Sequence, residues 1–158
     1  MDEFDSSIDA SSGSFLSLLH RISQLADKQF EAMLGDGVAT VRQVQLLMAI
    51  EADDGASQAE LSQATGIDRS TMTDMIRRLS KRHLITRRRS ASDARTYVVK
   101  LTKEGRAELA RWRQALESVE KGLLQGLSRP QQSSLMGTLQ SVLARSGESG
   151  RESDKSVR

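Results

Sequence analysis

The chain has 158 residues, enough for one domain with a substantial core, and 37% of them are hydrophobic while 28% are charged. It contains no cysteine, which excludes disulfides, thiolate metal sites and sensing by thiol oxidation. No apolar run approaches the length of a membrane helix, and the serine-rich, acidic N-terminus is unlike a signal peptide, so we expect a cytoplasmic protein.

The chain is expected to begin with a flexible arm over residues 1–14, which contain four acidic residues and no basic one. From Phe15 to about Leu34, apolar residues recur on one broad stripe, which predicts a helix ending before Gly35. A second helix is expected to start at Thr40, because Thr40 and Gln43 have the spacing of a capping box.

A helix-turn-helix is predicted next. Ser57 and Glu60 again have capping-box spacing and predict a short helix over residues 58–64. Asp68 is a good N-cap for a second helix, expected over residues 69–82. Two helices joined by such a short turn are typical of a DNA-binding motif in which the first helix supports the second.

The second helix of this pair has two different faces. Apolar residues recur at helical spacing on the side that we expect to be buried, namely Met72, Met75, Ile76 and Leu79. The opposite side carries short polar side chains and arginine, at Arg69, Ser70, Thr73 and Arg77. Side chains of this kind near a helix N-terminus can reach base edges and phosphates in a major groove.

A β-hairpin with a basic first arm follows. Its strands are expected over residues 84–89 and 95–101, joined by a turn over residues 90–94, and the second strand has the β-propensity of Tyr97, Val98 and Val99. A two-stranded ribbon with an arginine near its tip can lie along a minor groove and insert that arginine.

Positive charge is concentrated in these two elements. Residues 67–100 contain ten basic and three acidic residues, a formal charge of +7, whereas the whole chain carries only +2 and the remainder therefore −5. Any one arginine is explained well enough as solvated surface. Three consecutive arginines beside a basic helix instead favour a phosphate-binding face.

Thr102 is expected to cap a long helix, whose apolar residues repeat in three- and four-residue steps at Leu109, Trp112, Leu116, Val119, Leu123 and Leu127. Ser128 and Gln131 have capping-box spacing, and Pro130 suits the first turn of a last helix expected over about 129–144. Residues 146–158 are expected to be disordered.

The apolar stripes of the terminal helices have no partner in the hairpin or the helix-turn-helix. A twofold dimer would bury them, and packing against each other in a monomer is the alternative.

The order of these segments and their local sequence motifs resemble those of the MarR-type bacterial winged-helix transcription regulators, over about residues 15–143. The resemblance includes Asp93 and Arg95 in the hairpin and the Leu101-Thr102-x-x-Gly105 pattern that opens the next helix. It implies a mainly α fold with a small β-hairpin wing. Residues 40–101 would form the winged helix-turn-helix, and residues 15–39 and 102–145 the N- and C-terminal dimerisation helices.

The predicted DNA-binding residues are Arg69, Ser70, Thr71, Thr73, Arg77, Arg78, Lys81, Arg82, Arg87, Arg88, Arg89, Asp93 and Arg95. Those with candidate major-groove roles are Ser70, Thr71, Thr73 and Arg77, and most of the other basic residues are expected to bind phosphates. The resemblance implies that Asp93 steadies Arg95 or the turn while the wing tip enters the minor groove.

The resemblance also implies a small-molecule effector, an aromatic carboxylate or an acyl-CoA thioester, bound between the dimerisation helices and the winged helix. The candidate residues are His20, Arg21, Phe30, Arg42, Met48 and Trp112. Each of them is also explained simply as core or surface.

No cofactor, metal site or enzyme activity is expected. The two histidines, His20 and His83, lack metal-ligand spacing, and the chain has no phosphate-binding loop or nucleophile motif. We therefore expect a homodimeric, ligand-responsive repressor that binds a pseudo-palindrome with half-sites roughly 10 base pairs apart. The alternatives are a nonspecific nucleoid-type DNA-binding protein and a winged-helix protein-interaction module.

Overall fold

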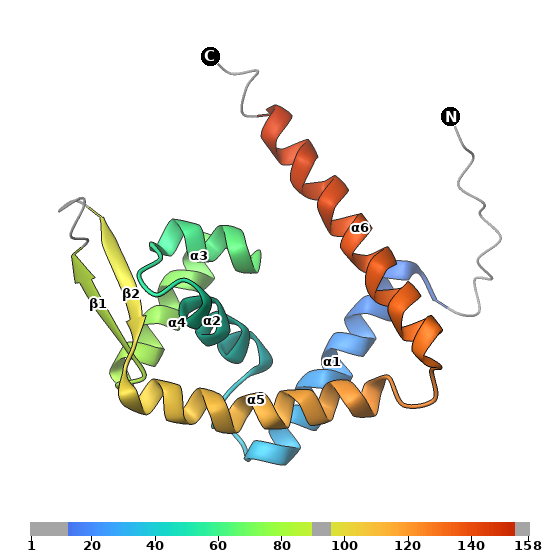
Figure 1. Cartoon of the computed structure of the whole chain (residues 1–158), viewed down its shortest axis with the longest axis horizontal. Coiled ribbons are helices and arrows are strands. Elements are labelled where there is room, and N and C mark those ends of the chain that lie inside the picture. The colour runs from blue at the N-terminus through green and yellow to red at the C-terminus, as the bar shows by residue number, and fades with distance from the viewer. Residues whose placement is uncertain (1–12, 90–95, 154–158) are drawn as a thin grey trace. The chain divides into compact units, whose positions relative to one another are not determined.

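The structure is a computed structural model that describes residues 13–89 and 96–153, with side chains described up to residue 145. Its elements are α1 (Phe15–Leu34), α2 (Val41–Ala52), α3 (Gln58–Thr65), α4 (Arg69–Lys81), β1 (Ile85–Arg89), β2 (Tyr97–Leu101), α5 (Lys103–Leu123) and α6 (Arg129–Ser153) (Figure 1). This order is the expected one, and the mainly α fold with a two-stranded antiparallel hairpin is confirmed. Within the described ranges, no helix is both long and apolar enough to cross a membrane.

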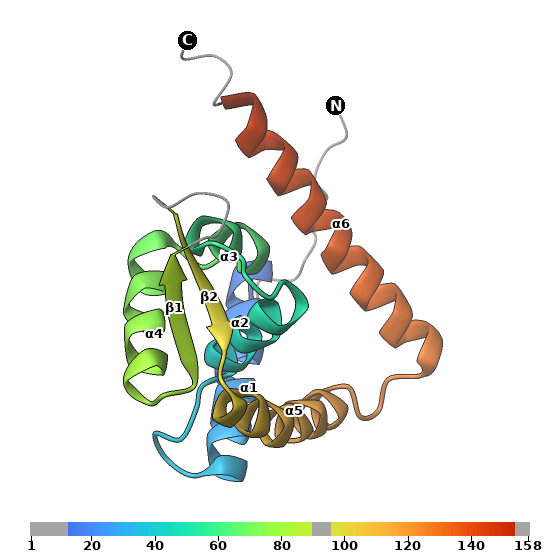
Figure 2. The same cartoon turned by 60° about the vertical axis from the view of Figure 1, so that its left-hand side comes forward.

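The chain divides into two compact units, Met1–Glu120 and Lys121–Arg158. The first contains α1 to α4, the hairpin and most of α5, and the second contains the end of α5 and α6. Within the first unit, α4 and the hairpin lie side by side in both views (Figures 1 and 2).

The helices of the first unit begin where the sequence indicates, because each has a side chain that caps its free N–H groups. Thr40 with Gln43 and Ser57 with Glu60 form complete capping boxes at α2 and α3. The Asp68 carboxylate accepts from the N–H groups of Ser70 and Thr71 at α4. These contacts are local in sequence, which is why the sequence predicts them well.

The hairpin pairs β1 with β2 in antiparallel register, from Ile85 opposite Leu101 to Arg89 opposite Tyr97. The first strand begins one residue later than predicted, because the N–H of Leu84 donates to the carbonyl of Leu79 and so completes the end of α4. The segment before α3 adds an isolated bridge to β2, which the sequence analysis missed.

The core of the first unit is built by α2, α4, the hairpin and α5, with one buried residue each from α1 and α3. All four apolar residues predicted on the inner side of α4 are buried, as are Leu109, Trp112, Leu116 and Val119 of α5. All of the buried residues among those described are apolar or glycine. The buried face of α4 therefore leaves its polar face available at the surface.

The apolar stripe of α1 is largely open to solvent in the single chain. Phe30 is buried, whereas Leu18, Ile22 and Leu25 are 40%, 53% and 46% exposed. In the second unit, taken by itself, Leu135 and Met136 of α6 are 41% and 50% exposed.

The second unit differs from the sequence-based expectation in three places. The helix α6 continues to Ser153, beyond the predicted end near Ala144, so the expectation of disorder was wrong for residues 146–153. No proline interrupts this stretch, and each residue added to a formed helix gains a backbone hydrogen bond.

The apolar repeat that was predicted to reach Leu127 ends earlier, because α5 stops at Leu123. Gly126 has a φ of 98° in the connecting turn. The third capping box is only half formed, since the Gln131 side chain accepts from Ser128 while the Ser128 hydroxyl caps no N–H.

His83 is the only non-glycine residue with a positive φ, 57°, in the described part of the chain. It follows the C-terminus of α4, where its N–H donates to the Ser80 carbonyl and the N–H of Leu84 donates to the Leu79 carbonyl. Glycine is preferred at this position, because a side chain there crowds the backbone.

We therefore expect His83→Gly to raise the free energy of unfolding by about 0.5–1 kcal/mol, because the relief of strain exceeds the added freedom of the unfolded chain. Urea unfolding followed by circular dichroism measures this. His83→Ala is the control, since it keeps the strain and removes the imidazole. Equal destabilisation by both substitutions would contradict the explanation by strain.

Candidate DNA-binding surface

The polar face of α4 is exposed as the sequence predicts. Arg69, Ser70, Thr73 and Arg77 are all exposed, and Thr71 is half-buried at the first turn. Hydrogen bonds from Thr71 and Ser70 hold the pKa of Asp68 well below its usual value, so the carboxylate at the start of α4 is ionised at neutral pH. The Ser70 hydroxyl donates to Asp68 Oδ1 at 2.7 Å, so its hydrogen is engaged in the cap and the oxygen remains as an acceptor.

Thr73 is held by two hydrogen bonds. Its hydroxyl donates to the Arg69 carbonyl at 2.8 Å and accepts from Gln58 Nε2 at 2.7 Å. Gln58 is the first residue of α3, so this contact links the two helices of the motif on their exposed side. Sequence reasoning missed Gln58, because the bond joins residues fifteen positions apart.

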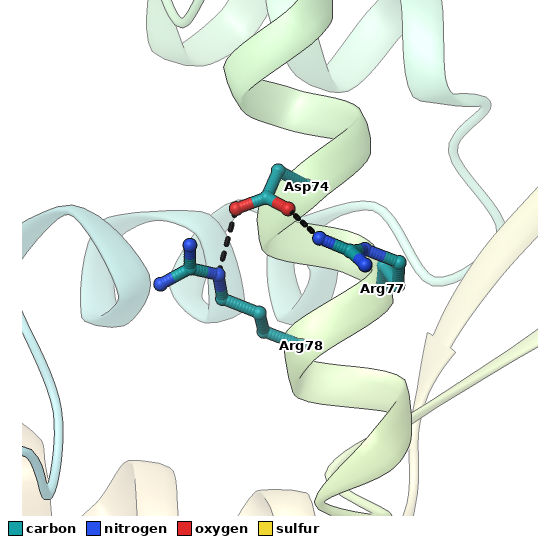
Figure 3. Close-up of polar contacts among 3 residues, drawn as sticks. All are labelled: Asp74, Arg77 and Arg78. Carbon is teal, nitrogen blue, oxygen red and sulfur yellow. Dashed lines mark hydrogen bonds and ion pairs between the residues drawn. The ribbon is translucent and has the colours of Figure 1, made fainter.

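Asp74 lies between two of the predicted arginines and was also missed. Figure 3 shows Arg77 Nη2 at one carboxylate oxygen of Asp74 and Arg78 Nε at the other, 2.7 Å away. The hydrogen bond from Arg77 is the main reason that the pKa of Asp74 is lowered. The sequence does carry a signal for these pairs, since an acid three and four residues before a base can pair along a helix.

Lys81 and Arg82, at the C-terminal end of α4, have different surroundings. Lys81 is exposed, as a phosphate contact requires. The Arg82 guanidinium lies over the ring of Trp112 in α5, 5.2 Å from its centroid, a cation–π distance. This contact ties the end of α4 to the long helix, which the predicted phosphate role of Arg82 did not include.

The arginines of the wing lie on two faces of the hairpin. Arg87 and Arg89 share a face with Tyr97, and their guanidinium carbons are 4.2 and 5.8 Å from its ring centroid. Arg88 is paired with Val98 on the opposite face. All three arginines are exposed. Asp93 and Arg95, the other two predicted wing residues, lie outside the described residues.

The six candidate effector residues come from α1, α2 and α5, and their role in binding an effector stays a prediction. Arg21 borders a hollow of about 450 Å³ on α1, and Arg42 borders a different one of about 320 Å³ with Asp27 and Glu31. The remaining candidates are buried in the core or stand on the exposed surface: Phe30 and Trp112 are buried, His20 is exposed with Nε2 3.0 Å from Gln24 Nε2, and Met48 is 36% exposed on α2.

Known proteins resemble the chain in both sequence and structure. The MarR family model matches residues 39–96. The transcriptional repressor NicR of Pseudomonas putida is 33% identical over 92 residues, 58% of this chain and 58% of NicR. In NicR and in two other curated relatives that match the chain, the matched segment spans about three fifths of the relative's length.

Solved structures cover more of the chain. The regulator BpsR of Bordetella bronchiseptica, whose DNA binding is regulated by 6-hydroxynicotinic acid, has a TM-score of 0.78 at 26% identity, covering 83% of this chain and 94% of BpsR. The repressor CouR bound to a 23-mer DNA duplex has a TM-score of 0.76 at 28% identity, covering 85% and 96% of the two chains. With its winged helix-turn-helix and its exposed basic face, the chain is similar in sequence and in fold to transcription regulators of the MarR family.

Proposed function

We propose that this protein is a homodimeric repressor that binds a pseudo-palindromic DNA site and is released from it by a small aromatic acid or acyl thioester. The observation that carries the proposal is the exposed face of α4, rich in arginine and short polar side chains, beside a wing with three exposed arginines. Such a face can read base edges in a major groove while the wing contacts the backbone or the minor groove. A regulator of this kind acts on the bacterial chromosome, in the cytoplasm.

The exposed apolar residues of α1 support the dimer. Soluble monomers rarely expose a contiguous apolar stripe of this length, and a second copy of the chain would cover it. Twofold symmetry would place two α4 helices about one turn of DNA apart, which a single winged helix cannot do.

The effector part of the proposal is supported by BpsR, whose DNA binding responds to an aromatic acid. Among the residues that the structure describes, the buried Nε1 of Trp112 has no hydrogen-bond partner. A buried unpaired donor costs roughly 1–3 kcal/mol, so an acceptor on a ligand that reached it would be favoured. Trp112 is the single tryptophan, and its fluorescence therefore reports binding directly.

The test begins with DNA captured by the purified protein from a random library. We expect one short symmetric site, protected in a footprint, with two chains per duplex and an affinity that falls steeply with salt. Addition of aromatic acids and coenzyme A thioesters to this complex then identifies the effector, as release of DNA with a change in Trp112 emission.

Two other results would select the alternatives. Equal affinity for all duplexes would indicate a nonspecific DNA-binding protein. Absence of binding to any duplex at low salt would favour a protein-interaction module with an acidic partner.

A further inference from the structure

Asp74 is the single acidic residue of α4 and lies within its predicted DNA-binding face. Residues 69–82 contain five basic residues and this one carboxylate. Arg77 Nη2 donates to its Oδ1, and Arg78 Nε donates to its Oδ2 at 2.7 Å (Figure 3). One carboxylate therefore holds two of the arginines that are expected to contact DNA.

The simplest explanation is that these pairs stabilise the helix, as exposed pairs with this spacing do weakly. That explanation accounts for the spacing but not for the location on the face. The side chains of Arg77 and Arg78 are 63% and 66% exposed, and that of Asp74 is 37% exposed. The arginines are thus accessible to DNA while both stay attached to a common anion.

The geometry leaves each guanidinium able to bind a second acceptor. An arginine has five N–H donors in a fixed plane, and the ion pair engages Nη2 of Arg77 and Nε of Arg78. Guanine offers two acceptors in the major groove that match the remaining donors. A phosphate that approaches the same arginines meets the negative charge of the Asp74 carboxylate, which opposes its binding.

We propose that Asp74 is a specificity-determining residue for DNA: it fixes the guanidinium groups of Arg77 and Arg78 toward base edges and weakens their attraction to phosphates. Nonspecific binding is almost wholly electrostatic, so a carboxylate on this face opposes it more than it opposes the specific complex. The inference rests on the proposed function and assigns a role within it to a residue that does not itself bind DNA.

The test compares Asp74→Asn with the wild-type protein on two duplexes of equal length, one selected by the wild-type protein and one of random sequence. We expect the affinity for the random duplex to rise about tenfold and the ratio of selected to random affinity to fall about tenfold. The dependence of log K on log salt for the random duplex should steepen by about one per protomer, as one more phosphate is neutralised.

Glu108→Gln on α5 is the matched control. Glu108 pairs with Arg111 Nη2 at 2.8 Å with the same three-residue spacing, and the two side chains are 36% and 60% exposed. The substitution removes the same charge from a pair outside α4, so both affinities should change by one common factor. Asp74→Glu keeps the charge and should retain most of the discrimination, which separates charge from mere disturbance of the helix.

The result that would overturn the inference is an Asp74→Asn protein whose selected-to-random ratio matches that of Glu108→Gln. The proposed function would then stand, with Asp74 reduced to a helix-stabilising residue. If the wild-type protein bound neither duplex at low salt, the proposed function itself would fail, and the inference with it.

Discussion

Gly105→Ala is expected to lower the free energy of unfolding by about 3 kcal/mol or more, at the upper end of what overpacking costs. A Cβ on Gly105 would overlap the carbonyl oxygen of Leu84 and lie 2.9 Å from its carbonyl carbon. Neither atom can rotate away as a side chain would. The same carbonyl accepts from the N–H of Thr102 at 3.1 Å, so its displacement would also loosen the start of α5.

Thermal or urea unfolding of the purified variants measures this loss. Gly137→Ala in α6 is the matched control, because a Cβ built there meets no atom within 4 Å. Alanine favours a helix by about 1 kcal/mol relative to glycine, so this control should be neutral or stabilising. A Gly105→Ala protein as stable as wild type would mean that the contact between α5 and the end of α4 is looser than described.

Replacement of the three wing arginines, Arg87, Arg88 and Arg89, by alanine is expected to weaken DNA binding at least about 100-fold. Each charge-assisted hydrogen bond to a phosphate is worth roughly 1.5–3 kcal/mol, and 100-fold corresponds to only about 2.7 kcal/mol. The salt dependence of log K should become shallower by up to about 2.7 per protomer, since up to three phosphates are no longer neutralised.

Fluorescence titration of a labelled duplex at several fixed salt concentrations measures both quantities. The triple lysine variant is the control: it keeps the charge, and its salt dependence should stay close to that of wild type. The fold should persist in both variants, because all three side chains are exposed. An unchanged salt dependence in the alanine variant would show that the wing does not touch the backbone of DNA.

Several features of the fold follow from short stretches of sequence. The capping boxes at α2 and α3, the Asp68 cap and the buried face of α4 depend on residues within a few positions of one another. Helical periodicity and cap spacing are local physics, so the exposed, basic face of α4 could be predicted before any tertiary contact was known.

The sequence predicted the candidate site less completely, because several of its contacts join distant residues. The Gln58 to Thr73 bond and the stacking of Arg82 on Trp112 depend on how the helices pack. The effector-binding role of His20, Arg21, Phe30, Arg42, Met48 and Trp112 stays a prediction.

By itself, the sequence determined the order of elements, the starting residues of the helices and the concentration of positive charge in α4 and the wing, because these depend on spacing and composition. Only the tertiary structure decided which partners those charges have and why residue 105 must be glycine. Leu84 and Gly105 are twenty-one positions apart, and their contact exists only because the wing returns the chain to the end of α4. Packing between distant segments is set by the whole fold, and no local pattern encodes it.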